Sequence, residues 1–224
     1  MRSGSLLIFD LDGTLFHTET VTVPATRAAF ERHGLAPPSH EAVCAFIGRP
    51  GVEFSAWLTT LCPPTVAEQI VRDAAERELE LIGESGVLYP GVPEMLAELE
   101  ARAAAMAICS NGSRRYVEAV LGALGIGRFF AAVRFRTPTD RDKPQMLADL
   151  LRKLGRPAGG GGVVVGDRSD DVESARANGL LAVGCGYGYG RDGELDGADG
   201  VAASPAQIVG LVDRLLGAQA EVNG

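Results

Sequence analysis

The chain has 224 residues, of which 46% are hydrophobic and 22% are charged, a balance typical of a soluble globular protein rather than a disordered or fibrous one. The formal net charge is -8, so no excess of basic side chains is present to neutralise nucleic-acid phosphates or anionic lipid headgroups. Composition therefore disfavours nucleic acid and membrane as partners, and no apolar run approaches the roughly 18 residues of a membrane span.

The first residues and the cysteines indicate a cytoplasmic protein. The apolar run at residues 6–9 is too short for a secretory signal and meets an acidic residue at once. Cys44, Cys62, Cys109 and Cys185 are scattered, without a CxxC motif or the Cys/His spacing of a zinc site. We expect reduced, mostly buried thiols and no zinc.

Short apolar runs alternate with helical patterns along most of the chain. Strands are expected at 6–10, 105–110, 132–135, 163–166 and 180–183, and helices at 94–102, 115–124, 144–154, 171–177 and 205–216. Because the strands are continuously apolar, they predict an α/β fold: a doubly wound parallel sheet with helices on both faces. The glycine run at 159–162 precedes its strand, so we interpret it as a surface turn rather than a phosphate loop.

One interval, residues 16–86, breaks this alternation because it contains no convincing strand. Helical patterns occupy 24–33, 40–46, 52–61 and 65–81, separated by glycines and prolines. We therefore predict an all-helical domain at 16–86, inserted after the first strand of a core domain formed by 1–15 and 87–224. Connectors are expected near 16–20 and 83–90.

Two carboxylates, Asp10 and Asp12, stand directly after the first expected strand. Buried carboxylates this close together are costly to desolvate unless a cation or a proton compensates them. Gly13 lets the backbone approach a ligand closely, and Thr14 adds a hydroxyl. An acidic surface turn would not need the apolar run before it, so we interpret the segment as part of a ligand site.

Two further segments place polar groups in loops at strand ends or helix starts. Ser110, Asn111 and Gly112 follow the second strand, where a hydroxyl and backbone N–H groups could hold phosphoryl oxygens. A simple helix cap would also explain the serine. Lys143 precedes Pro144, which suits the first turn of a helix, and this position distinguishes it from an ordinary surface lysine.

Three carboxylates, Asp167, Asp170 and Asp171, follow the fourth expected strand. The carboxyl ends of parallel strands share one edge of the sheet, so these groups should converge with those after the first two strands. Mg²⁺ prefers carboxylate oxygens together with water and phosphate. A helix-capping role for Asp170 or Asp171 is compatible with metal binding.

These motifs, in this order, resemble the haloacid dehalogenase superfamily. The match comprises Asp-Leu-Asp-Gly-Thr at 10–14, Ser110, Lys143-Pro144 and Gly166-Asp167-x-x-x-Asp171. The tail Gly-Tyr-Gly-Tyr-Gly at 186–190 is similar to the phosphoglycolate-phosphatase-like branch. The resemblance implies a Rossmann-like core, a mobile helical cap formed by the insert, and a phosphatase for a small phosphorylated metabolite, as a monomer or homodimer.

The resemblance also implies catalytic roles. Asp10 is the nucleophile that becomes transiently phosphorylated, and Asp12 protonates the leaving oxygen and then activates water. Ser110 and Lys143 bind the phosphoryl oxygens. The other carboxylates and a phosphate dianion outweigh the charge of Mg²⁺ and Lys143, so the pKa of Asp12 should be raised, as a general acid requires.

The binding residues complete this assignment. The implied metal ligands for Mg²⁺ are Asp10, Asp12 through its carbonyl, Asp167 and Asp171, with either Asp170 or Asp171 completing the shell. The implied substrate contacts are Thr14, Asn111, Gly112 and Arg49. Arg49 belongs to the glycine- and proline-rich segment 46–51, and in relatives with a helical cap the loop at this point contacts the leaving group. Its guanidinium could pair with a second anionic group.

Two departures from the branch put phosphoglycolate in doubt as the substrate. His17 stands where many relatives carry an acidic residue, and Ser110-Asn111-Gly112 replaces the more common Thr-Asn-Lys. We expect His17 to be a hinge or surface residue rather than a ligand. Phosphoglycolate, a sugar phosphate and a nucleoside monophosphate all remain open.

Three other kinds of protein share some of these motifs. A phosphohexose mutase of this superfamily stays open because it shares every phosphatase motif. A true haloacid dehalogenase needs neither Mg²⁺ nor an acid at position 12, so Asp12 and the pair Asp167/Asp171 argue against it. A two-component receiver domain is shorter and lacks both the insert and the Asp-x-Asp motif.

Overall fold

In the computed structural model, which describes residues 6–102, 104–156 and 161–222, six parallel strands form one sheet in the order β3-β2-β1-β4-β5-β6. The strands are β1 (Leu6–Phe9), β2 (Ala105–Ser110), β3 (Ala132–Phe135), β4 (Val163–Gly166), β5 (Leu181–Cys185) and β6 (Gly200–Ala202). The chain runs outward from β1 to β3 and then returns to place β4 on the other side of β1. The strand order thus reverses between β1 and β4, where ligands bind in folds of this kind.

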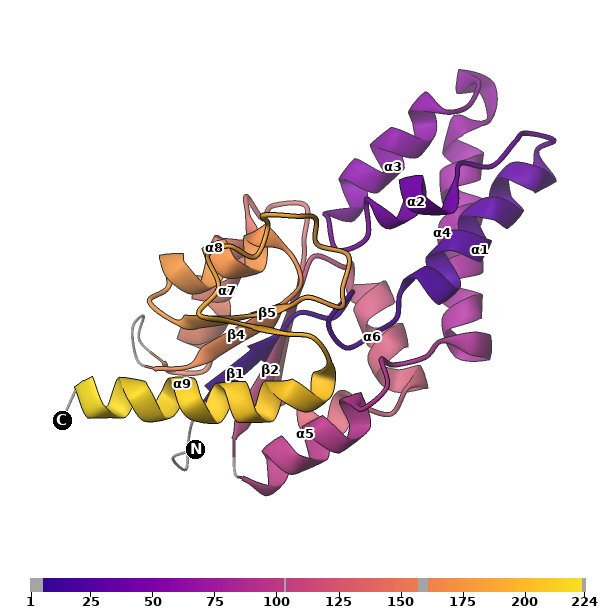
Figure 1. Cartoon of the computed structure of the whole chain (residues 1–224). Coiled ribbons are helices and arrows are strands. Elements are labelled where there is room, and N and C mark those ends of the chain that lie inside the picture. The colour runs from indigo at the N-terminus through magenta and orange to yellow at the C-terminus, as the bar shows by residue number, and fades with distance from the viewer. Residues whose placement is uncertain (1–5, 103, 157–160, 223–224) are drawn as a thin grey trace.

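Helices cover both faces of the sheet, as the apolar strands predict (Figure 1). One face packs against α5 (Val92–Ala101), α6 (Arg114–Ala123) and α9 (Ile208–Val222), and the other against α7 (Lys143–Lys153) and α8 (Ser169–Ala177). Leu7 and Phe9 point to the first face, and Leu6 and Ile8 to the second, because successive strand residues alternate in direction. The predicted doubly wound fold is confirmed.

The segment between β1 and α5 is helical, as expected, and lies to one side of the sheet domain (Figure 1). It contains α1 (Glu19–Arg32), α2 (His40–Cys44), α3 (Gly51–Thr60) and α4 (Pro64–Ser85). These helices share a small apolar core that includes Phe30, Leu58 and Ile70. Its two connections to the sheet run side by side, with an antiparallel bridge between Phe16 and Leu88. We call this segment the helical insert.

Several boundaries differ from the sequence prediction. Helix α1 begins at Glu19 rather than at residue 24, because the N–H groups of Val21 and Thr22 bond to the Thr18 carbonyl and form a first turn ahead of Pro24. The proline therefore lies within the helix instead of starting it. Helix α4 continues to Ser85, so the second connector starts at residue 86 rather than 83.

At the C-terminal side the prediction missed one strand and simplified one helix. The three-residue edge strand β6 pairs with β5 through Val183 and Gly200 and is too short to give an apolar pattern. The helix expected at 205–216 consists of a 3-10 turn, η2 (Pro205–Gln207), followed by α9. A second 3-10 turn, η1 (Gly127–Phe129), precedes β3. Of the glycine run at 159–162, residues 159 and 160 lie outside the described ranges, as do residues 1–5.

The remaining global expectations concern thiols and membranes. Cys109 and Cys185 are buried free thiols, whereas Cys44 and Cys62 are half-buried, so the expected burial holds for two of the four. In the part of the chain that the structure describes, none of the helices has the length and apolar character needed to cross a membrane.

Candidate active site

Asp10 directly follows β1 at the point where the strand order reverses. Its backbone N–H donates to the Val165 carbonyl of β4, and its side chain is 1% exposed. Lys143 Nζ lies 3.1 Å from Asp10 Oδ1. Burial raises the pKa of Asp10 to about 7, although the charge of Lys143 opposes the rise. Among the described residues, Asp10 Oδ2 has no hydrogen-bond partner, so this oxygen is available to a ligand.

Lys143 is the first residue of α7, and its side chain points back into the sheet edge. Asp142 caps the helix by accepting a hydrogen bond from the Gln145 N–H at 2.8 Å. The lysine side chain is 2% exposed, and its Nζ lies 2.7 Å from Asp171 Oδ1. Burial alone would lower the pKa of Lys143, but Asp10, Asp170 and Asp171 raise it well above its usual value. The group therefore remains a cation inside the site.

Asp10, Asp167 and Asp171 converge as the sequence predicts. Each offers one oxygen, and these oxygens lie within 4.8 Å of one another. Burial, together with the charge of Asp171, raises the pKa of Asp167 to about 8. Asp167 Oδ1 has no hydrogen-bond partner within the described ranges. A buried group of hard oxygens with unused lone pairs has the chemistry of a Mg²⁺ site.

The glycine- and tyrosine-rich segment 186–190 packs against Asp167. The Tyr189 N–H donates to Asp167 Oδ2 at 2.7 Å and leaves Oδ1 without a hydrogen-bond partner among the described residues. A Cβ on Gly188 would lie 2.3 Å from Asp167 Cβ, and one on Gly190 would lie 2.1 Å from the Asp167 carbonyl oxygen. These glycines are required because any side chain would displace Asp167. Gly13 has φ 73°, and a Cβ added to it would lie 2.1 Å from Asp167 Oδ2.

Asp12 points toward the helical insert rather than into the cluster of Asp10, Asp167 and Asp171. Its Oδ1 accepts hydrogen bonds from Thr18 Oγ1 at 2.7 Å and from Tyr116 Oη at 2.5 Å. Burial raises the pKa of Asp12, and these two hydrogen bonds partly oppose the rise. No sequence pattern pointed to Thr18 or Tyr116, because each occupies an ordinary position at a helix start and only packing brings them to Asp12.

At the end of β2, Ser110 lies buried at the sheet edge, and Asn111 links the edge to the helical insert. Ser110 is fully buried, and its Oγ accepts the Gly112 N–H at 3.0 Å. The Asn111 amide donates to the Gly48 carbonyl at 2.9 Å and to Asp170 Oδ2 at 2.7 Å. Asn111 Oδ1 also accepts from Arg136 Nε. Asn111 thus ties the helical insert to the sheet edge, and its contact with a substrate stays a prediction.

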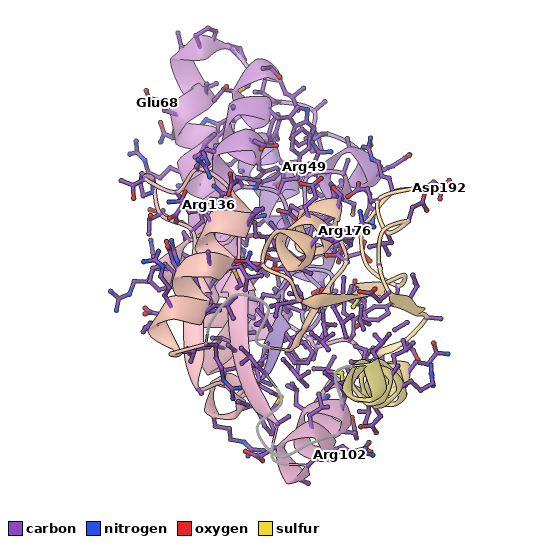
Figure 2. The ribbon with its side chains drawn as sticks, turned by 90° about the vertical axis from the view of Figure 1, so that its left-hand side faces the viewer. Arg49, Glu68, Arg102, Arg136, Arg176 and Asp192 are labelled. Carbon is purple, nitrogen blue, oxygen red and sulfur yellow. The ribbon has the colours of Figure 1, made fainter. Side chains whose placement is uncertain are left out.

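A cavity of about 500 Å³ lies between the helical insert and the sheet edge. Residues of both parts line it, among them Asp12, Asn111, Gly112, Tyr116, Arg136, Arg49 and Glu78. Figure 2 shows Arg49 and Arg136 at the junction of the two parts. The fully buried Thr14 is not among the lining residues. Asp12 thus joins this cavity to the loop that carries Asp10.

The cavity walls carry opposite charges. Arg49 lies over the Phe46 ring, 5.5 Å from its centroid, with Nη1 only 3.9 Å from Glu53. Glu78 accepts a hydrogen bond from Thr22 Oγ1. Burial raises the pKa of Glu78 to about 7, against this hydrogen bond. One wall is therefore a guanidinium, and another is a carboxyl group that titrates near neutrality.

The strand order and the aspartates clustered at its reversal are typical of α/β enzymes that bind ligands at the carboxyl edge of the sheet. The sequence model of the haloacid dehalogenase-like hydrolases matches residues 7–185. The chain belongs to this family of hydrolases.

Relatives agree with the branch that the sequence motifs indicate. The chain is 32% identical over 195 residues to a phosphoglycolate phosphatase of Pseudomonas fluorescens, covering 82% of this chain and 70% of the relative. It is 31% identical to a phosphoglycolate phosphatase of Pectobacterium atrosepticum, and the match covers 92% of this chain and 91% of the relative. The crystal structure of a predicted phosphoglycolate phosphatase from Haemophilus somnus superposes with a TM-score of 0.83 at 24% identity. The superposition covers 94% of this chain and 99% of that one. The resemblance to this branch is confirmed.

Proposed function

We propose that this protein is a Mg²⁺-dependent phosphatase that hydrolyses a small phosphomonoester through an aspartyl-phosphate on Asp10. The observation that carries the proposal is the Asp10 carboxylate, buried at the strand reversal beside Lys143 with one oxygen unused. The similarity to proteins named phosphoglycolate phosphatase supports the reaction class. We expect the enzyme to act in the cytoplasm as a monomer or homodimer.

The metal would be held by Asp10, Asp167 and Asp171, whose oxygens lie within 4.8 Å of one another. The Asp12 carbonyl is a further expected ligand. When bound, Mg²⁺ supplies positive charge that offsets these carboxylates and the phosphoryl oxygens. Lys143 and Ser110 bind the remaining phosphoryl oxygens, and the cationic Lys143 attracts the dianion.

Two displacements complete the reaction. An Asp10 oxygen attacks phosphorus, the bond from phosphorus to the leaving oxygen breaks, and Asp12 donates its proton to that oxygen. Asp12, now ionised, takes a proton from water; the water oxygen attacks phosphorus, and the Asp10–phosphorus bond breaks to release phosphate. Thr18 and Tyr116 hold Asp12 on the leaving-group side throughout.

The cavity favours a leaving group larger than glycolate. A two-carbon acid would fill only a small part of about 500 Å³. The carboxyl group of Glu78 would repel a carboxylate when ionised and would accept hydrogen bonds from hydroxyl groups. Arg49 and Arg136 can bind a second anion. We therefore place a sugar phosphate ahead of phosphoglycolate among the candidate substrates.

A phosphohexose mutase is the second candidate, because a cavity of this size also admits a sugar that reorients inside it and takes the phosphoryl group back at another hydroxyl. The two differ in product: a phosphatase releases inorganic phosphate, whereas a mutase returns an isomeric sugar phosphate. A haloacid dehalogenase is less favoured, since its reaction has no use for an acid at Asp12 or for a cation at Asp167.

The test is hydrolysis of a generic aryl phosphate and a panel of phosphomonoesters, with acid quenching to trap a phosphorylated Asp10 for mass spectrometry. We expect phosphate release with Mg²⁺, loss of activity with EDTA, recovery on adding excess Mg²⁺, and phosphate on the peptide that contains Asp10. Full activity in metal-free buffer would overturn the metal assignment. Isomerisation of a sugar phosphate without stoichiometric phosphate release would favour the mutase.

A further inference from the structure

A group of mixed ligand atoms lies where the helical insert leaves the sheet domain, apart from the carboxylates at the sheet edge. Glu19 is the first residue of α1, and His40 and Cys44 are the first and last residues of α2. His40 and Cys44 are four residues apart, so they share one face of the short helix. That face is turned toward Glu19.

The ligand atoms are already close together. Glu19 Oε2 lies 3.0 Å from His40 Nε2 and 3.2 Å from Cys44 Sγ, and the three ligand atoms lie within 4.8 Å of one another. In a tetrahedral zinc site with bonds of about 2.0–2.3 Å, neighbouring ligand atoms are roughly 3.3–3.8 Å apart. Side-chain shifts of a few tenths of an ångström would therefore make room for an ion.

A second histidine fixes the orientation of the carboxylate. His17 Nε2 lies 2.9 Å from Glu19 Oε1, whereas His40 and Cys44 both bond to Oε2. The His17 ring is itself held by stacking on Tyr89, with ring centroids 4.7 Å apart. Outer partners of this kind orient ligands and raise metal affinity.

We propose that Glu19, His40 and Cys44 form a second cation site, selective for a borderline divalent metal such as Zn²⁺, although the scattered cysteines predicted no zinc. One sulfur, one nitrogen and one oxygen suit Zn²⁺, whereas Mg²⁺ prefers the all-oxygen set at the sheet edge. The His40 side chain is 63% exposed and that of Glu19 28%, which leaves an entry path and room for a water as fourth ligand.

The position of this site suggests what it controls. The Glu19 backbone N–H donates to Tyr189 Oη at 2.9 Å, and Tyr189 in turn holds Asp167. Helix α2 leads directly into the turn that carries Arg49. A bound ion would tie α2 to the start of α1 and so restrict movement of this turn relative to the sheet edge.

Cobalt titration of the metal-stripped full-length protein tests the site without relying on any activity. Co²⁺ is added in the presence of excess Mg²⁺, and the near-ultraviolet thiolate-to-cobalt charge-transfer band is recorded. The oxygen ligands at the sheet edge cannot produce this band. We expect saturation at one equivalent of Co²⁺ and loss of the band on adding Zn²⁺.

Variants assign the band to these residues. Cys44→Ser should abolish it, and His40→Ala should weaken Co²⁺ binding at least tenfold. Cys62→Ser is the matched control, because Cys62 is the other half-buried thiol and its hydrogen bonds go to the helix carbonyls of Leu58 and Thr59, away from Glu19 and His40. Circular dichroism confirms that each variant is folded; should Cys44→Ser be unfolded, the exposed His40 still provides the test. Absence of the band in the wild type, its survival in Cys44→Ser, unchanged affinity in His40→Ala, or its loss in Cys62→Ser would each overturn the proposal.

Discussion

The sheet edge and the helical insert bring polar groups together in different ways. At the edge, Asp10, Ser110 and Asp167 each lie at or directly after the last residue of a strand, and parallel register sets them side by side and buried. In the insert, polar residues such as Glu19 and Glu78 stand on helices whose mutual packing alone decides what they face. The edge is therefore a rigid arrangement of a few atoms, whereas the insert forms the walls of a cavity.

This difference predicts a division of labour. Substitutions at the edge should reduce turnover of every phosphomonoester, because they alter the reacting groups. Substitutions in the insert should change KM for some substrates and leave others unaffected, because they alter contacts with the leaving group.

Asp10→Asn should abolish turnover for all substrates, with a loss on the order of 10⁴-fold or more, because an amide cannot form the acyl phosphate. Steady-state kinetics measures the loss, and circular dichroism checks that the fold is retained. Wild-type kcat in this variant would rule out the covalent mechanism.

Asp12→Asn should slow both halves of the reaction by about 10²–10⁴-fold, the range typical of general acid–base groups. Rapid-quench kinetics separates formation of the phosphoenzyme from its hydrolysis. Slowing of only one half would mean that Asp12 transfers a proton in that half alone.

Mg²⁺ should stabilise the protein more at high pH than at low pH. Burial raises the folded-state pKa of Asp10 to about 7 and that of Asp167 to about 8, from 3.8. With raised folded pKa values, their contribution to stability is complete below about pH 4 and is lost as pH rises through about 8.

The metal requires the ionised carboxylates, so its own stabilisation should grow over the same window. At 100 times its Kd, Mg²⁺ should add about 2.7 kcal/mol at pH near 8. Thermal unfolding with and without Mg²⁺ near pH 5 and pH 8 measures this effect. Equal shifts in Tm at both pH values would contradict the assigned ligands.

Tyr116→Phe should lower kcat roughly tenfold, the effect of losing one hydrogen bond to a charged group. The Tyr116 hydroxyl lowers the pKa of Asp12, so its removal should raise that pKa. The high-pH limb of kcat/KM, where Asp12 loses its acidic proton, should move to higher pH. In a double variant with Asp12→Asn the shift should vanish; its persistence would show that Tyr116 acts elsewhere.

Arg49→Ala should raise KM for the best substrate about tenfold, or ~1.4 kcal/mol, while a small aryl phosphate without a second anion is hardly affected. Arg27→Ala is the matched control, because Arg27 lies on α1, pairs with Glu31 and is 62% exposed. Equal effects on both substrates would assign Arg49 to folding or closure of the insert. No effect on either would make it a surface residue.

The sequence by itself determined the sheet and most of its polar edge. Buried strands are continuous apolar runs, and parallel strands must present their carboxyl ends together, so the meeting of Asp10, Asp167 and Asp171 follows from local patterns. Lys143 could be placed for a similar reason, since it opens the helix before the fourth strand. The short strand β6 and the start of α1 escaped prediction because neither has a local apolar signal.

Only the tertiary structure decided which side chains support and surround those groups. Tyr116 reaches Asp12, and Tyr189 holds Asp167, across 104 and 22 positions of the chain. His40 and Cys44 meet Glu19 only because α2 packs against α1. Each of these residues occupies an ordinary helix or loop position, and a helix can turn the same pattern toward many partners. Their roles depend on packing between distant segments, which no local sequence pattern records.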